Sequence, residues 1–252
     1  MPCAPFAFMR VPRRILALVF TAMIMADAAG QDLYAVQRKA MVDTLARITR
    51  ETGVESGRER LSDRVLAAMN KVPRHRFVTP DLASHAYENR PLPIGNGQTI
   101  SQPFIVALMT DLLDLKPGDK VLEIGTGCGY QAAVLGELAR EVYTIEIIAP
   151  LAQEAAARMA ALGYRNVTAR SGDGYAGWPE HAPFDAIIVT AAAPAVPPAL
   201  VEQLKPGGRL VIPVGPQWSG QQLLVIEKDA RGNITTRNVL AVRFVPLTRD
   251  MQ

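Results

Sequence analysis

The run Val121–Tyr130, with the sequence VLEIGTGCGY, constrains the fold more than any other part of the chain. A short apolar stretch typical of a buried strand leads into three glycines at alternate positions, and a helical pattern follows. Glycines let the backbone turn sharply and approach a ligand closely, and the first turn of a helix offers free N–H groups. The run therefore predicts a ligand-binding turn between a central strand and a helix.

Strand and helix patterns alternate through the C-terminal half of the chain. Strands are expected over residues 120–124, 141–146, 166–170, 186–190 and 209–214, with helices over 131–139, 151–162 and 198–204. Near-continuous apolar strands separated by helices indicate a parallel sheet covered on both faces. Two more strand patterns, over 222–227 and 234–245, flank a turn and predict a hairpin. The predicted fold is α/β: a doubly wound, mostly parallel Rossmann-like sheet with helices on both faces and a C-terminal antiparallel hairpin at its edge.

The N-terminal half is expected to be mainly helical. Residues 33–51, 62–71 and 103–115 show helical spacing, whereas 79–99 is rich in Pro and Gly and is expected to be mostly loop. We expect residues 31–252 to form a single domain. Within it, 31–117 would supply helices and a substrate loop, and 118–252 a cofactor-binding sheet.

Residues 1–30 look like a targeting leader and are excluded from the fold. Arg10–Arg14 is basic, Ile15–Met25 is apolar but too short to span a bilayer, and Ala26–Ala28 has the A-x-A pattern of a cleavage site. The alternative is a start codon assigned too far upstream, with synthesis beginning near Met41. Without residues 1–28 the chain keeps 24 basic and 23 acidic side chains. This near-balanced charge does not indicate binding to nucleic acid, which requires an excess of basic side chains.

Cysteine and histidine usage predicts neither a disulfide framework nor a metal site. Only Cys128 remains once the leader, which contains Cys3, is set aside. His75, His85 and His181 are far apart and show no ligand spacing.

Spacing around the glycines indicates which cofactor would bind. Glu146 ends the second strand, 21 residues after Gly125, where a carboxylate can accept hydrogen bonds from both ribose hydroxyls of a nucleoside. The loop reads G-x-G-x-G rather than the G-x-G-x-x-G of dinucleotide sites, and it lacks the lysine of a P-loop. This favours S-adenosyl-L-methionine over NAD. Asp173, between two glycines, is interpreted either as a ligand of the adenine amino group or as a turn residue. The predicted cofactor-binding residues are Glu123, Gly125, Thr126, Gly127, Gly129, Tyr130, Glu146, Asp173 and Gly174.

From about residue 62 to residue 247 the chain resembles the protein-L-isoaspartate O-methyltransferases, which act on spontaneously damaged aspartyl and asparaginyl residues. The motifs that carry the resemblance are VPRHRFV (72–78), LPIGNGQTISQP (92–103), VLEIGTGCGYQAAVL (121–135), GDGYAGWP (172–179), FDAIIVTAAAP (184–194), LKPGGRLVIPVG (204–215) and RFVPL (243–247). The glycine loop is common to methyltransferases, whereas GNGQTISQP together with RFVPL is specific to this family. Cys128 departs from the family pattern, where a serine or another small residue is expected, and so does the leader.

The resemblance implies roles for residues outside the glycine loop. Ser101 is the expected catalytic residue, although a serine two positions before Pro103 is also a natural helix N-cap. The expected substrate-binding residues are Ile94, Gln98, Thr99, Arg243, Phe244 and Val245.

The implied activity is transfer of the cofactor methyl group to the free α-carboxylate of L-isoaspartyl residues in damaged proteins and peptides. The chain is expected to work as a monomer in the cytoplasm, where the methyl donor is made, with export as the alternative if the leader is a cleaved signal. The alternative functions that the sequence leaves open are those of a small-molecule O-methyltransferase, an NAD-dependent oxidoreductase and a non-catalytic nucleoside-binding module.

Overall fold

Seven strands form one sheet in the computed structural model, which describes residues 34–216 and 220–249. The strand order is β5-β4-β3-β6-β7-β8-β9, with parallel pairing from β5 to β7 and antiparallel pairing of β8 and β9. The strands are β3 (Lys120–Ile124), β4 (Glu141–Glu146), β5 (Val167–Ser171), β6 (Phe184–Val189), β7 (Leu204–Val214), β8 (Gln221–Lys228) and β9 (Ile234–Val242). The predicted fold class is confirmed, including the terminal hairpin, whereas the predicted leader lies outside the described residues.

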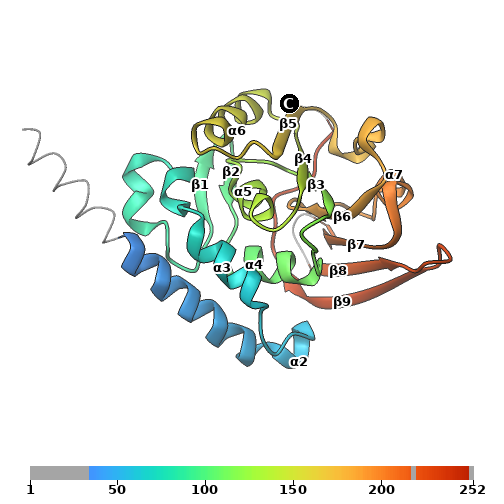
Figure 1. Ribbon diagram of the computed structural model, residues 1–252, viewed down its shortest axis with the longest axis horizontal. Coiled ribbons are helices and arrows are strands. Elements are labelled where there is room, and N and C mark those ends of the chain that lie inside the picture. The colour runs from blue at the N-terminus through green and yellow to red at the C-terminus, as the bar shows by residue number, and fades with distance from the viewer. Residues whose placement is uncertain (1–33, 217–219, 250–252) are drawn as a thin grey trace, which may run out of the picture.

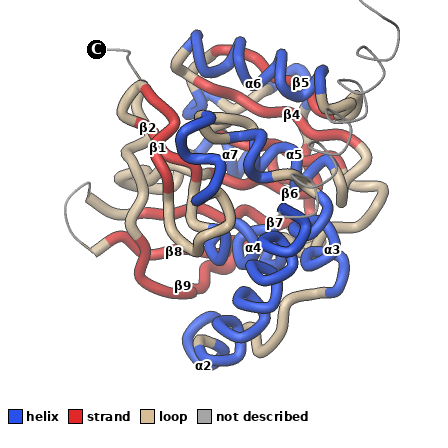
Figure 2. The backbone as a smooth tube through the Cα atoms, turned by 90° about the vertical axis from the view of Figure 1, so that its left-hand side faces the viewer, coloured by secondary structure: helices blue, strands red, loops and turns tan. Residues whose placement is uncertain are grey.

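Helices cover both faces of the sheet (Figure 2), which is why its central strands are mainly apolar. Neighbouring residues of a strand point to opposite faces, so Val121 and Leu122 of β3 belong to different core clusters. The cluster with Val121 includes residues of α4 (Pro103–Leu112), α5 (Tyr130–Gly136) and α6 (Ala149–Ala161). The cluster with Leu122 includes Trp178 and residues of α7 (Pro198–Gln203).

A small hairpin stands where a loop was expected. Strands β1 (Leu92–Gly95) and β2 (Gln98–Ile100) pair antiparallel. Asn96 and Gly97 connect them, both with positive φ, at 52° and 68°. An Asn-Gly pair is the residue choice that a tight two-residue hairpin turn demands. The expectation of a loop was wrong here because the prolines and glycines around the turn obscured two very short strands.

The N-terminal helices pack into the same core as the sheet (Figure 1). They are a helix over residues 34–51, α2 (Gly53–Ser56) and α3 (Asp63–Lys71), followed by the short 3₁₀ turns η1 (Arg74–Phe77) and η2 (Pro80–His85). Met41 and Leu45 of the first helix are buried in one cluster with Val65 of α3. Two further 3₁₀ turns, η3 (Gly174–Ala176) and η4 (Pro179–His181), precede β6. Within the described ranges, no helix has the length and apolar content needed to cross a membrane.

Each of the three histidines has a different partner. His75 stacks on Tyr34, His85 pairs with Glu88, and His181 stacks on Tyr143. Residues 34–216 and 220–249 contain no cluster of three or more His, Cys, Asp or Glu side chains that could hold a metal ion.

Candidate active site

A cleft opens at the carboxyl ends of β3, β4 and β6. The chain runs from β3 through β4 to β5 and then returns to β6 on the other side of β3. In such sheets ligands bind at the point where the strand order reverses. The cleft holds about 770 Å³ of empty space, counting the part open to solvent, which suits a nucleoside cofactor. Its walls include the ends of β3 and β4, residues 98–101 after the hairpin turn, and the C-terminal segment 245–248.

Gly125 allows the backbone to turn at the end of β3. Its φ is +96°, and a Cβ atom there would lie 2.5 Å from the hydroxyl oxygen of Thr190. That hydroxyl lies 2.6 Å from the carbonyl oxygen of Gly125 and 3.0 Å from that of Ile124. Any larger residue would therefore break the contact that joins the ends of β3 and β6. Thr190 is not among the site residues predicted from the sequence, although its position directly after a parallel strand could have indicated it.

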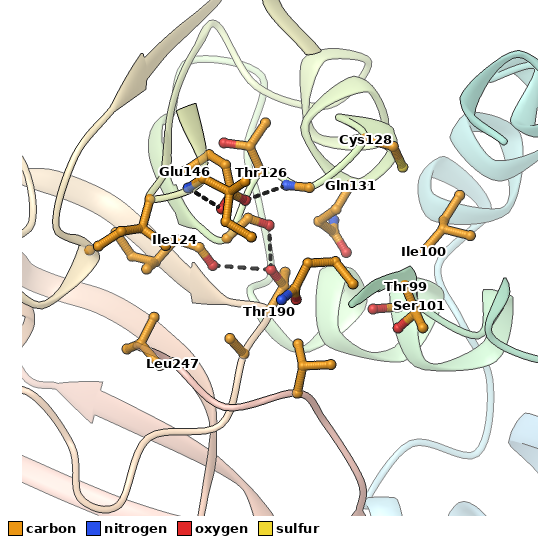
Figure 3. A pocket seen from close by; sticks show the side chains of 18 of the residues that line it. Thr99, Ile100, Ser101, Ile124, Thr126, Cys128, Gln131, Glu146, Thr190 and Leu247 are labelled. Carbon is orange, nitrogen blue, oxygen red and sulfur yellow. Dashed lines mark hydrogen bonds between the residues drawn. The ribbon is translucent and has the colours of Figure 1, made fainter. Parts of the chain in front are cut away.

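Glu146, at the end of β4, has the free acceptor capacity that a nucleoside needs. Its Oε2 accepts from the backbone N–H of Gly127 at 2.7 Å, and its Oε1 from that of Ile148 at 3.0 Å. Each oxygen of an ionised carboxylate can accept a second hydrogen bond. Figure 3 shows Glu146 beside Thr126 on one side of the cleft, with Thr99 and Ser101 on the other. The backbone thus holds the carboxylate in place at the cleft wall.

The Gly-Asp-Gly sequence after β5 contributes through its glycine. Gly174 lines the cleft, and a Cβ atom there would collide with the side chain of Ile124. Asp173 is exposed and is not among the lining residues. Its Oδ1 accepts from the backbone N–H of Tyr175 at 2.8 Å, so it acts as the cap of η3. Its role toward adenine therefore stays a prediction.

The glycine run includes the buried residues Glu123, Cys128, Gly129 and Tyr130, and of these Cys128 and Tyr130 also line the cleft. Burial raises the pKa of Glu123 to about 8, and its Oε2 accepts from the hydroxyl of Thr144 at 2.5 Å. The side chain of Tyr130 is 1% exposed, with its hydroxyl 3.8 Å from the sulfur of Met69. Gly129, with a φ of +90°, precedes α5 and faces α6, and burial raises the pKa of the Cys128 thiol. These residues shape the loop from within.

A second hollow adjoins the cofactor cleft at Ser101. It is lined by Pro91, Thr99, Ser101, Gln102, Ile105, Thr190 and residues 241–245. Thr99, Ser101, Thr190 and Val245 line both hollows. Ser101 therefore lies where two ligands, one in each hollow, would meet.

The side chain of Ser101 does not cap α4. Gln102 occupies the N-cap position without a side-chain cap bond, and Pro103 is the first helical residue. Among the described residues, the Ser101 hydroxyl has no hydrogen-bond partner. The interpretation of Ser101 as an N-cap was wrong because the helix begins one residue later than that interpretation requires. The hydroxyl is free to bind a ligand.

The predicted substrate-binding residues come from two segments that face the hollows. Gln98 and Thr99 line the cofactor cleft, and the side chain of Ile94 packs over Gly127. Arg243, Phe244 and Val245 line the second hollow. Their backbone is held by the Gln221 side-chain amide, which accepts from the N–H of Phe244 at 2.6 Å and donates to its carbonyl at 3.2 Å. Gln221 is a supporting residue that we did not predict, since a glutamine in a strand carries no specific signal.

Known proteins similar to this chain agree on one family. A family model described as protein-L-isoaspartate(D-aspartate) O-methyltransferase matches residues 38–252. Protein-L-isoaspartate O-methyltransferase 1 of Cupriavidus necator is 56% identical over 97% of this chain and 96% of its own length. Protein-L-isoaspartate O-methyltransferase 2 of a Polaromonas species is 60% identical over 82% of this chain and 99% of its own length.

A solved structure gives the same result. A putative protein-L-isoaspartate O-methyltransferase of Plasmodium falciparum, in complex with S-adenosyl-L-homocysteine, has a TM-score of 0.67. It is 25% identical, with 82% of this chain and 98% of that chain covered. The chain therefore belongs to the protein-L-isoaspartate(D-aspartate) O-methyltransferase family, as its motifs predicted.

Proposed function

We propose that this chain transfers the methyl group of S-adenosyl-L-methionine to the free α-carboxylate of L-isoaspartyl residues in damaged proteins and peptides. The observation that carries the proposal is the position of Ser101, whose hydroxyl lies at the junction of two hollows and has no hydrogen-bond partner within residues 34–216 and 220–249. One hollow has the features of a nucleoside site, and the other leads to the segment 243–245. Family membership supports the same reaction.

The residues of the cleft fit the nucleoside part of the cofactor. Glu146 offers one free acceptor position on each oxygen for the two ribose hydroxyls. Gly125, Gly127 and Gly174 line the cleft, where a residue without a side chain presents its backbone directly to a ligand. When bound, S-adenosyl-L-methionine supplies a methyl group on a positively charged sulfur.

Ser101 would orient the attacking carboxylate. An α-carboxyl group has an ordinary pKa of about 3.3–3.7, so it is already ionised at neutral pH and needs no general base. The negative charge of the carboxylate and the positive charge of the sulfonium both disappear as the methyl group moves. A reaction that loses charge gains from a site with little water. Holding the two reactants in line can supply roughly 7–11 kcal/mol of the barrier reduction.

The direct test is transfer of tritiated methyl groups from S-adenosyl-L-methionine to an isoaspartyl peptide, with the matching aspartyl peptide as control. We expect incorporation into the isoaspartyl peptide alone, and release of the label as methanol in base, because the product is a carboxyl ester. Equal labelling of both peptides, or label that is stable in base, would contradict the proposal.

Replacing Glu146 tests the cofactor site. Glu146→Gln should weaken S-adenosyl-L-methionine binding by ~1.5–3 kcal/mol, the range for a hydrogen bond to a charged group. The amide keeps the shape of the side chain, so the bond to Gly127 or Ile148 can persist, whereas alanine would remove both. Calorimetric titration measures the change, and Glu141→Gln, at the other end of the same strand, is the control. Unchanged affinity in Glu146→Gln would remove this residue from the ribose site.

We place the activity in the cytoplasm, where the methyl donor is made, and propose that the protein works as a monomer. The near-balanced charge of the chain outside the leader supports damaged proteins and peptides, rather than nucleic acid, as its partners.

A further inference from the structure

A buried cation, Arg74, lies directly behind Ser101. It comes from η1, within the VPRHRFV motif, and its side chain is 0% exposed. Its Nε donates to the carbonyl oxygen of Ala86 at 2.8 Å, and its Nη2 donates to the carbonyl oxygen of Ser101 at 2.7 Å. The mechanism described above gives this residue no role.

The charge of Arg74 has no counterion among the described residues. No carboxylate lies within salt-bridge distance there, and Nη1 is buried without a hydrogen-bond partner. Buried charges in proteins are almost always paired, because an unpaired one loses its hydration without compensation.

The other side chains that act on the guanidinium are uncharged: the phenols of Tyr130 and Tyr87 and the thiol of Cys128. The guanidinium lies over the ring of Tyr130, 4.7 Å from the ring centroid, where a cation–π attraction offsets part of the lost hydration. Burial lowers the pKa of Arg74 from its ordinary value, yet a guanidinium stays protonated in proteins. The region behind Ser101 thus keeps a net positive charge in a poorly screened environment, where a charge acts over a longer distance than in water.

We propose that Arg74 is a positioning residue for the substrate α-carboxylate: it fixes the backbone of Ser101 and supplies the positive potential that draws the anion to the Ser101 hydroxyl. This inference rests on the proposed function, because it takes the α-carboxylate as the group that Ser101 receives. Arg74 lines neither hollow, so it acts on the substrate through Ser101 and not by direct contact.

The reaction explains why the positive charge of Arg74 lies behind Ser101 and not in contact with the substrate carboxylate. Methyl transfer converts the carboxylate into a neutral ester, so a cation in direct contact would stabilise the starting anion more than the transition state and slow the step. Ser101 instead offers a neutral donor, while Arg74 acts from behind it. Loss of the Arg74 charge should therefore raise KM for the peptide more than it lowers kcat.

The test compares two peptides that differ only in charge. One carries an isoaspartyl residue with its α-carboxylate, and the other carries the same residue with an α-carboxamide. In the presence of S-adenosyl-L-homocysteine, which cannot donate a methyl group, the protein should bind the carboxylate peptide at least about tenfold more tightly than the amide peptide. This measurement on the unmodified chain needs no variant to fold.

Three variants then assign the preference to Arg74. Arg74→Gln should reduce the carboxylate preference by about tenfold and leave affinity for the amide peptide within about threefold. Arg74→Lys, which keeps the charge, should restore most of the preference. Arg76→Gln is the matched control, because Arg76 belongs to the same turn but is exposed.

Three results would each overturn the inference. The first is equal binding of the two peptides by the unmodified protein. The second is a folded Arg74→Gln protein that keeps the full carboxylate preference, and the third is a folded Arg74→Lys protein that loses as much of the preference as Arg74→Gln. Failure of the proposed function is a separate result, since it appears as absence of methyl transfer to the isoaspartyl peptide by the unmodified protein.

Discussion

Ser101→Asp should give a folded protein that binds the cofactor and has lost at least about 99% of its methyl transfer. A second carboxylate in contact with the substrate anion repels it, and two like charges about 4 Å apart interact by roughly 4 kcal/mol near a protein surface. The fold should survive because the Ser101 hydroxyl makes no hydrogen bond within the described residues, and the side chain is only partly buried. The positive charge of Arg74 behind this position should keep the new carboxylate ionised.

Ser101→Ala is the companion variant that separates charge from the loss of the hydroxyl. Since Gln102 rather than Ser101 takes the N-cap position, the free energy of unfolding should change by no more than about 0.5 kcal/mol. Activity on an isoaspartyl peptide should fall by about 10- to 100-fold in kcat/KM, as expected when a donor to a charged group is lost. Cofactor affinity should stay the same in both variants. A stable Ser101→Asp protein with undiminished activity would show that Ser101 does not contact the substrate.

Glu123→Gln should make the protein more stable than the unmodified chain, increasingly so as the pH rises from 5 to 8. Burial raises the pKa of Glu123 from its ordinary value of 4.5 to about 8, so the folded protein holds a proton that the unfolded chain releases above about pH 4.5. The stability of the unmodified chain therefore falls through this window, by up to about 1.4 kcal/mol per pH unit, and levels off above pH 8. Glutamine does not titrate, so the variant escapes this loss.

Urea unfolding at pH 5, 7 and 9 measures the effect. The difference in unfolding free energy between Glu123→Gln and the unmodified chain should be small at pH 5 and should grow to several kcal/mol at pH 9. Glu141→Gln, on the neighbouring strand and partly exposed, is the control and should follow the unmodified chain. Parallel stability curves for Glu123→Gln and the unmodified chain would mean that Glu123 is already ionised in the folded protein.

The alternation of strands and helices, and with it the parallel sheet, could be predicted from the sequence. In a strand such as β3, consecutive apolar residues indicate that both faces of the sheet are buried. The helical patterns between the strands supply the covering helices. The position of the cleft followed as well, because the glycine run and Glu146 end neighbouring parallel strands, whose carboxyl ends meet at one edge. Local periodicity and short spacings suffice for the order of the elements and for the contact between β3 and β4, because these two strands belong to one βαβ unit, whereas the pairing of β3 with β6 joins distant parts of the chain.

The hairpin and the cap assignment show where local patterns were insufficient. The Asn96–Gly97 turn was visible in the sequence, but two strands of four and three residues give too little alternation to be recognised. Ser101 satisfied the residue preferences of an N-cap, and only the observed start of α4 at Pro103 excluded that role. A difference of one residue in the helix start decides whether a hydroxyl bonds to the helix or remains free.

The sequence by itself thus determined the fold class, the cofactor cleft and the family of this protein, while the tertiary structure decided which polar groups have partners. Thr190 reaches Gly125 across 65 positions of the chain, and Arg74 reaches Ser101 across 27. Whether Arg74 lacks a counterion, or Glu123 lies deep enough to keep its proton, depends on every element packed around it. Desolvation and Coulomb interactions act through space. The spacing of residues along the chain therefore does not show which charged side chains are buried or unpaired, and only the folded arrangement of the elements does.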